Sequence, residues 1–464
     1  MPLKGGLEFT SADKRAAWQT EWANFAPRFG LAYKVTDKLV FRGGYGIFYP
    51  QTGGGSRDGF STTTSWNSTV GQDGITPNIG SLLSNPYPNG LAQPIGNSRG
   101  LLTQVGENVN AFYYNHPLSY VQSFSSDIQY EITSGMVFEV GYTGTQGRKL
   151  LFGATQQANQ LHPSFLSQGS ALDQQVANPF FNVIPTGALA GATVPRHRLL
   201  RPHPQFLGVN VSVDTPGASS SFNALVARFH WRLGAHLNFL STYQWSKAID
   251  NASAWQGWEV SDTLRDYYNL EVDRSISAHD IPQSFVNTLV YELPVGKGRK
   301  YGNDMHPIAN AVIGGWQVST IIRFSSGLPL SFTAPNTLSN YGYQVQRPNI
   351  VTDFASAAVE NPTPDSWFNT AAFRAPGQYE IGNAPRWVPN IRFGPTNHAD
   401  FAILKNFRWG ESIKAQLRGE MFNVTNTPQL GRANTTLGSG DFGRVTGTTN
   451  VGPRNIQLGL RVQF

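Results

Sequence analysis

The sequence predicts an all-β fold, an antiparallel transmembrane β-barrel with long outer loops and short periplasmic turns. Three observations predict it: apolar and polar residues alternate in about eleven segments, short turns join several segments in pairs, and long polar stretches separate the pairs. Helical periodicity is nearly absent. No run of about 18 apolar residues occurs, so no membrane-spanning helix is predicted.

The alternating segments are clearest at the end of the chain. Ile456, Leu458, Leu460, Val462 and Phe464 are apolar, and the residues between them are polar or Gly. This period of two is the signature of a strand with one apolar and one polar face. In chain order, the predicted strands cover residues 25–35, 39–49, 120–131, 136–143, 225–232, 237–246, 285–293, 316–324, 400–407, 413–421 and 456–464.

The connections between these strands differ in length. Tight turns with Gly, Asp, Asn or Ser chemistry join several pairs, at residues 36–37, 133–135, 233–235 and 409–411, and a longer link covers 294–314. Long polar stretches separate the pairs, at residues 50–116, 145–219, 248–281, 325–397 and 425–452. Because all the long stretches fall on one side, the pattern is typical of an outer-membrane barrel.

A barrel of this kind places its apolar side chains against lipid and its polar side chains against a lumen. In hydrocarbon every backbone N–H and C=O must pair within the protein, so a sheet spans a bilayer by closing on itself. Aromatic residues gather near the strand ends, as interfacial girdles require: Tyr49, Trp231, Trp245, Tyr291, Trp316 and Phe464. The alternative is a soluble sandwich, in which the same apolar faces would pack in a dry core.

Composition and charge exclude several classes of protein. Charged residues make up 14% of the chain, where about 25% is usual. The net charge of +6 is spread without a dense Lys/Arg stripe, so no nucleic-acid partner is predicted. The absence of Cys excludes disulfides and thiolate metal sites. The first residues lack the apolar stretch of a secretory signal, and we therefore expect that residues are missing upstream.

The number of predicted strands is odd, and this has a consequence for domain organisation. If the last strand ends on the periplasmic side, strict alternation gives residues 25–35 the same direction. Bacterial single-chain barrels have an even number of strands. We therefore expect residues 1–24 to be the end of an outer loop and residues 25–464 to be the C-terminal part of a larger barrel.

Short segments along nearly the whole chain carry a family resemblance: residues 24–33, 41–46, 243–250, 280–285, 293–298, 314–317, 422–426 and 456–464. In this order they resemble the β-barrel of Oar-like TonB-dependent outer-membrane transporters. The resemblance implies the rear half of a barrel of about 22 strands, whose lumen is plugged in transporters of that size. Neither a plug nor the N-terminal carboxypeptidase-regulatory-like domain of the family is found in the sequence.

The resemblance also implies partners and a function. The terminal Phe464, with Ile456, Leu458, Leu460 and Val462 before it, resembles the signal read by the barrel assembly machinery. The intact protein would take up an unidentified solute, with energy from the TonB complex acting through the missing N-terminal part. Two alternatives stay open: a passive outer-membrane pore or adhesin, and a secreted soluble carbohydrate-binding β-protein.

Residues 255–280 hold the candidate ligand-binding side chains of an outer loop. Asp262 and Asp266 could bind a cation or steer a polar substrate, or they could be paired with arginines of a solvated loop. The aromatic residues could stack on a ligand or make the loop rigid by packing: Trp255, Trp258, Tyr267 and Tyr268.

Motifs for catalysis occur without the context that their chemistry needs. Residues 438–443 fit G-x-G-x-x-G, but no strand before them or helix after them is predicted. Residues 11–14 fit S-x-x-K without its partner motifs, and the nine His are scattered without metal-ligand spacing. The sequence therefore predicts no enzyme, no cofactor and no metal site.

Overall fold

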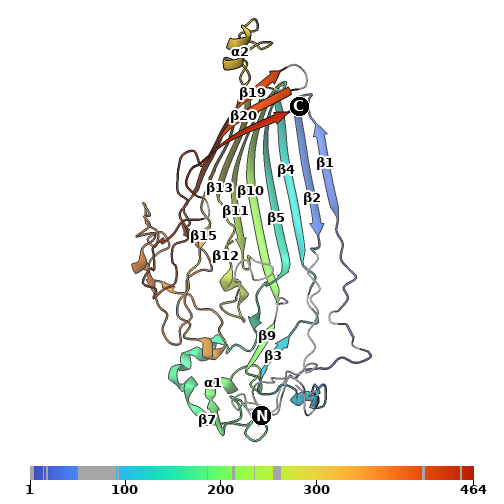
Figure 1. The fold of residues 1–464 in the computed structure, drawn as a ribbon. Helices are drawn as coiled ribbons and strands as arrows, with labels where there is room; N and C mark the ends of the chain where they lie inside the picture. The colour runs from blue at the N-terminus through green and yellow to red at the C-terminus, as the bar shows by residue number, and fades with distance from the viewer. Residues whose placement is uncertain are drawn as a thin grey trace.

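The protein is a long curved wall of strands with a layer of folded loops at one end (Figure 1). The computed structural model describes residues 5–13, 15–16, 19–50, 90, 93–115, 117–184, 187–211, 215–234, 236–253, 263–409, 413–449 and 452–464. Trp255, Trp258 and Asp262 lie outside these residues.

Eleven strands follow one another in chain order across the wall, and each pairs antiparallel with its neighbours. They are β1 (Arg28–Lys34), β2 (Leu39–Phe48), β4 (Tyr120–Thr133), β5 (Met136–Leu151), β10 (Pro216–Leu233), β11 (Leu237–Asp250), β13 (Gln283–Glu292), β14 (Trp316–Ser325), β19 (Thr396–Trp409), β20 (Ile413–Phe422) and β21 (Asn455–Gln463). The short β12 (Ser275–Ile276) also pairs with β11. Every strand predicted from the sequence is confirmed, and the all-β antiparallel fold with it.

Two strands continue into residues that the sequence assigns to a long loop. β5 runs on to Leu151 and β10 starts at Pro216, and the two stay paired there, with register shifts near Ala218. Many of their extra residues are Gly, Ser, Thr or Gln, so the apolar alternation that marks a lipid-facing strand is lost. A spanning strand needs about 9 to 11 residues, so β5 and β10 are long enough to extend beyond the bilayer on the loop side.

The register places the apolar residues of neighbouring strands in line on one face. One such row runs through Tyr33, Phe41, Ile128, Val140, Ala227, Tyr243, Phe285 and Phe324. These side chains are not packed away: Tyr33 is 60% exposed and Ile128 is 53% exposed. The next row, on the opposite face, includes Gln129, Glu139, Arg228 and Thr242. The apolar face thus has the exposure that a lipid-facing surface needs, and it does not form the dry core of a sandwich.

The packed interior of the protein lies among the long loops instead. Phe332, Phe368, Phe373 and Phe442 pack ring against ring, and the Phe332 and Phe373 rings stack with centroids 4.3 Å apart. A second cluster joins residues 161–172 to residues 338–343. Residues of different long loops therefore fold together into one layer, which we call the loop layer.

Where the structure describes it, the loop layer contains only short elements. They are η1 (Gly100–Leu102), β3 (Asn108–Ala111), β6 (Gln156–Gln157), η2 (Pro163–Asp173), β7 (Gln175–Ala177), β8 (Thr193–Pro195), α1 (Arg196–Leu199), β9 (Gly208–Val211), η3 (Leu270–Asp273), β15 (Pro329–Leu330), η4 (Ser339–Tyr341), β16 (Asn349–Ile350), η5 (Thr370–Ala372), β17 (Phe373–Arg374) and β18 (Val388–Arg392). None of the helices in the described ranges is both long and apolar enough to cross a membrane.

At the opposite end, short turns connect the strands. The β4–β5 turn contains Gly135 at φ +80°, where a Cβ atom would lie 2.3 Å from the carbonyl oxygen of Arg232. The longer link between β13 and β14 carries the helix α2 (Pro307–Ile313), which projects from this end (Figure 1). β1 and β21 are the two edges of the described sheet and run in the same direction, as the odd strand count requires.

Candidate functional site

The polar face of the wall carries charged side chains that pair across neighbouring strands or along one strand. Arg228 Nη1 lies 2.7 Å from Glu139 Oε1, and His398 Nε2 lies 2.9 Å from Asp400 Oδ1. These side chains are partly exposed. A face of this kind suits the polar interior of a barrel.

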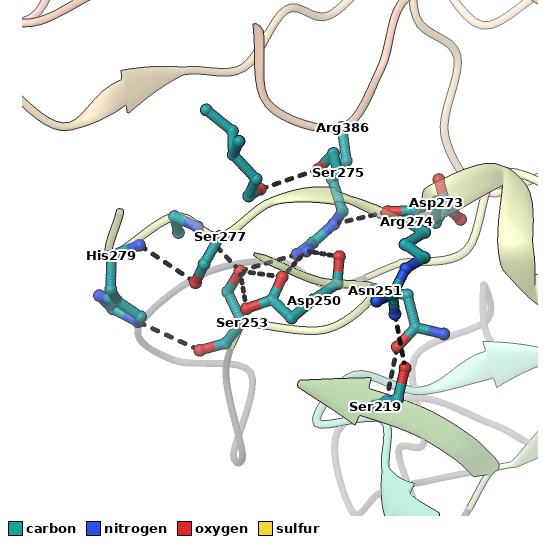
Figure 2. Close-up of polar contacts among 12 residues, drawn as sticks. Ser219, Asp250, Asn251, Ser253, Asp273, Arg274, Ser275, Ser277, His279 and Arg386 are labelled. Carbon is teal, nitrogen blue, oxygen red and sulfur yellow. Dashed lines mark hydrogen bonds and ion pairs between the residues drawn. The ribbon is translucent and has the colours of Figure 1, made fainter. Parts of the chain in front are cut away.

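At the loop end of β11, Asp250 forms the centre of a buried polar network (Figure 2). The Arg386 guanidinium forms an ion pair with the Asp250 carboxylate, and its Nη2 also donates to the Asp250 carbonyl oxygen at 3.1 Å. Ser253 Oγ donates to the same carboxylate at 3.0 Å and accepts from Arg386 Nη1 at 2.9 Å. Arg386 Nε donates to the Asp273 carbonyl oxygen at 3.2 Å. The network therefore ties the strand end to residues from two loops.

Two further ion pairs follow the same arrangement. Asp273 pairs with Arg347, and both side chains are at least 95% buried. Asp280 Oδ2 lies 2.6 Å from Arg392 Nη2. In all three pairs the carboxylate comes from residues 248–281 and the guanidinium from residues 325–397. The sequence left open that aspartates of this stretch pair with arginines in a solvated loop. The pairs in the structure instead join two loops, and their carboxylates are buried.

Arg265 adds an unusual buried cation beside these pairs. Its Nη1 donates to the carbonyl oxygens of Gly382 and Ala384, at 2.8 and 3.2 Å. Burial, together with the nearby Arg347 guanidinium, lowers the pKa of Arg265 from its usual value. The site holds this charge because backbone oxygens and the Asp273 carboxylate surround it.

The structure brings three predicted ligand residues together around Gln160. Asp266 Oδ1 accepts from Gln160 Nε2 at 2.8 Å, and the Tyr268 hydroxyl donates to the Gln160 carbonyl oxygen at 2.9 Å. The Tyr267 hydroxyl is hydrogen-bonded to the Tyr113 hydroxyl, and burial raises the pKa of Tyr267. Tyr268 keeps the most surface, 41% exposed. Ligand binding by these residues, and by the three outside the described ranges, stays a prediction.

Sequence reasoning missed a second polar group, around the buried side chain of His197. Its ring packs edge to face on Tyr341, with centroids 4.8 Å apart. The Asp173 carboxylate accepts hydrogen bonds from the Tyr341 hydroxyl at 2.6 Å and the Tyr379 hydroxyl at 2.8 Å. Burial, with a contribution from Arg201, lowers the pKa of His197 to about 4. Within the described part of the chain, no three His, Asp or Glu side chains are grouped as metal ligands would be.

The residues of the predicted assembly signal lie on the edge strand β21 and just after it. Ile456, Leu458, Leu460 and Val462 share the apolar face with Met421, Gly419, Leu417 and Ala415 of β20. Leu458 is 80% exposed, and Phe464 follows the strand fully exposed. These exposed apolar side chains are accessible to a receptor or to lipid. Their role as a signal for the barrel assembly machinery stays a prediction.

Comparisons with known proteins relate this architecture to a family. A family model described as the outer membrane beta barrel domain matches residues 2–457. No curated protein matches the sequence.

Solved structures similar to this one are proteins of the bacterial outer membrane. The outer membrane transporter YddB from Escherichia coli is 10% identical, with a TM-score of 0.44 over 95% of this chain and 40% of its own. The pyoverdine outer membrane receptor FpvA from Pseudomonas aeruginosa is 9% identical, with a TM-score of 0.38 over 96% of this chain and 36% of its own. The chain thus spans about two fifths of the length of these proteins.

Proposed function

Because this chain belongs to the family of the outer membrane beta barrel domain, we propose that its strands form the wall of an outer-membrane transporter and its loop layer the surface that captures the solute. Family membership places the protein in the bacterial outer membrane, in contact with outer-membrane lipid. The exposed apolar rows agree with that location. The alternative of a secreted soluble carbohydrate-binding protein does not agree with this location.

The observation that carries the proposal is the folded state of the loops. Three ion pairs with buried carboxylates and two apolar clusters hold the loops of different strands in one arrangement. A binding surface that is already ordered loses less conformational entropy when a ligand binds. Loops of this kind at the outer end of a wall are suited to selecting a solute, whereas a general pore has no need of them.

The finer proposal is an Oar-like TonB-dependent transporter, and it rests on the segments that resemble that family. In that reading residues 25–464 are the C-terminal part of a larger barrel, and residues 1–24 are the end of an outer loop. Contacts of this first segment support the second point: Gln205 Nε2 donates to the Gly5 carbonyl oxygen at 3.0 Å, and Gln19 N donates to that of Tyr114 at 3.0 Å. We propose wall and binding roles for this chain, and no catalytic step.

Conductance and pull-down measurements on the protein purified from its own outer membrane test the transporter against the passive pore. A plugged transporter is expected to show no steady conductance in planar bilayers and to bind the purified C-terminal domain of TonB. A steady ohmic conductance without TonB binding would overturn the TonB-dependent assignment and favour the pore. The same preparation, screened by thermal shift against classes of sugars, peptides and metal chelates, is expected to identify the solute.

A further inference from the structure

The helix α2, at the turn end of the wall, exposes its apolar side chains and turns a polar one toward the protein. Ile308 is 72% exposed, Val312 65% and Ile313 50%. By contrast, Asn310 is partly buried, and its Oδ1 accepts a hydrogen bond from Lys297 N at 2.7 Å. A helix on a water-exposed surface normally packs its apolar stripe against the core. In α2 the apolar side chains face outward instead, as they do on the apolar face of the wall.

Hydrogen bonds hold the end of α2 against the lipid-facing side of the wall. Trp316 Nε1 donates to the Val312 carbonyl oxygen at 2.9 Å, and Lys405 Nζ donates to the same oxygen at 3.3 Å and to that of Gly314. Trp316 and Lys405 are register partners, and alternation along the strands puts them on the apolar face. Lys405 Nζ also lies 5.2 Å from the centre of the Phe407 ring, on that face.

The apolar surface of the wall continues beyond this contact. β19 and β20 extend past the Trp316–Lys405 pair to the Trp409–Ile413 pair. Phe407 and Ile413 lie on the apolar face at that level, and Ile413 is 43% exposed. α2 therefore leaves the wall beside a stretch of surface that is still apolar, at its periplasmic margin.

Basic and aromatic side chains come just before the helix. Lys297 and Lys300 are exposed, and Lys300 Nζ lies 5.3 Å from the centre of the exposed Tyr301 ring. Arg299 is held closer to the wall, with its Nη2 3.0 Å from Glu292 Oε2. Ammonium groups and a tyrosine next to exposed aliphatic side chains form the pattern of a segment at a membrane interface.

We propose that Lys297, Lys300 and the helix α2 anchor the barrel in the periplasmic leaflet of the outer membrane. Ile308, Val312 and Ile313 insert at the boundary of the acyl chains, and Lys297 and Lys300 bind phospholipid phosphates. Two observations favour phospholipid as the occupant. The exposed surface of α2 is continuous with the lipid-facing wall, and the exposed cations beside it match anionic headgroups. The inference rests on the membrane location alone, so it holds whatever solute the protein transports.

The absence of Cys allows a single spin label to test this in the full chain. Val312→Cys, labelled with a nitroxide, is reconstituted in vesicles of phosphatidylethanolamine and phosphatidylglycerol. Collision with oxygen, which concentrates in the membrane, is compared with collision with a water-soluble nickel chelate. Asp304→Cys, on the exposed turn before the helix, is the matched control. We expect oxygen to dominate at position 312 and the nickel chelate to dominate at position 304.

Two results would overturn the proposal. A label at position 312 as accessible to nickel as the one at 304 would put α2 in water. Low collision with both reagents would mean that protein, a second copy or a periplasmic partner, covers the helix. Ile308→Cys gives the same readout if Val312→Cys does not fold, as judged by the heat-dependent shift in electrophoretic mobility that folded barrels show.

A second arm tests the phosphate contacts. Replacing both lysines, Lys297→Gln with Lys300→Gln, in the labelled Val312→Cys chain is expected to move the label toward water, so that nickel collision rises several-fold while the folded fraction is unchanged. An unchanged membrane depth of the label would show that the lysines do not bind phosphate. The proposed phosphate contacts would then be wrong.

Discussion

The wall and the loop layer place their apolar side chains in opposite ways: the wall exposes them, and the loop layer buries them. In the wall, Leu458 and its apolar neighbours on β21 are exposed, and Arg461 of the same strand lies on the other face. In the loop layer, Phe332 and Phe368 are buried, and ion pairs such as Asp273–Arg347 are buried with them. The wall has lipid as a partner for its apolar side chains, whereas the loop layer must supply its own interior.

The difference teaches where each region is vulnerable. A charge introduced on the apolar face of the wall meets hydrocarbon, so the damage falls on insertion. A charge removed from the loop layer leaves its partner buried without compensation, so the damage falls on local folding. Each region is expected to fail while the other remains intact.

The largest effect is expected from two charges at the end of the wall. Val462→Asp with Phe464→Asp places carboxylates on the apolar face and in the proposed assembly signal, and we expect loss of inserted protein. A charge on the lipid face costs about 2 to 4 kcal/mol for Lys or Arg near the midplane, and less for Asp near the interface. Gln457→Asp with Gln463→Asp is the matched control, because these residues lie on the opposite face of β21. Unchanged yield of heat-modifiable protein in the outer membrane would contradict the prediction.

A smaller and strictly local effect is expected from breaking the network at Asp250. Arg386→Ala leaves the Asp250 carboxylate buried with Ser253 alone, and we expect the loop layer to lose about 3 to 5 kcal/mol of local stability. Protease cleavage in residues 263–281, measured in urea, should rise while heat-modifiability stays unchanged.

The control for this variant is an exposed arginine in the same layer. Arg444 pairs with Asp365 at 2.8 Å, but both side chains are about half exposed or more. Arg444→Ala is therefore expected to leave the stability of the loop layer nearly unchanged, because water screens an exposed pair. Equal protease sensitivity of the two variants would mean that the buried pairs do not hold the loops together.

The same contrast explains what the sequence could predict. Wall strands such as β21 and β4 alternate apolar and polar residues because one face meets lipid, and that local signal located all eleven strands. The pairing of Asp250 with Arg386 joins residues 136 positions apart and leaves no local pattern. Asp266, Tyr267 and Tyr268 were predicted as ligand-binding residues of one loop. Their common partner Gln160 lies more than 100 positions away, and no local pattern in the sequence indicates this contact.

The smallest predicted effect is a pH dependence confined to the loop layer. His197 is buried and neutral in the folded protein, with its pKa lowered to about 4 by burial and by the charges of Arg201 and Arg198; Asp173 acts in the opposite direction. In the unfolded chain its pKa is about 6.5. Between these values the unfolded chain binds a proton that the folded chain does not, so stability falls as the pH drops from about 6.5 to 4 and this contribution is constant below 4.

The loss is at most about 3.5 kcal/mol, since one pKa unit corresponds to about 1.4 kcal/mol. Hydrogen exchange of amides in residues 196–207 at pH 6.5 and 5, corrected for the intrinsic rate, is the measurement, and amides of β4 in the wall should show no such change. His197→Gln should flatten the dependence above pH 5, where the carboxylates of the loop layer still keep most of their charge. If the exchange in His197→Gln changes with pH as much as before, groups other than His197 cause the effect. The acid sensitivity that distinguishes the loop layer from the wall would then not come from His197.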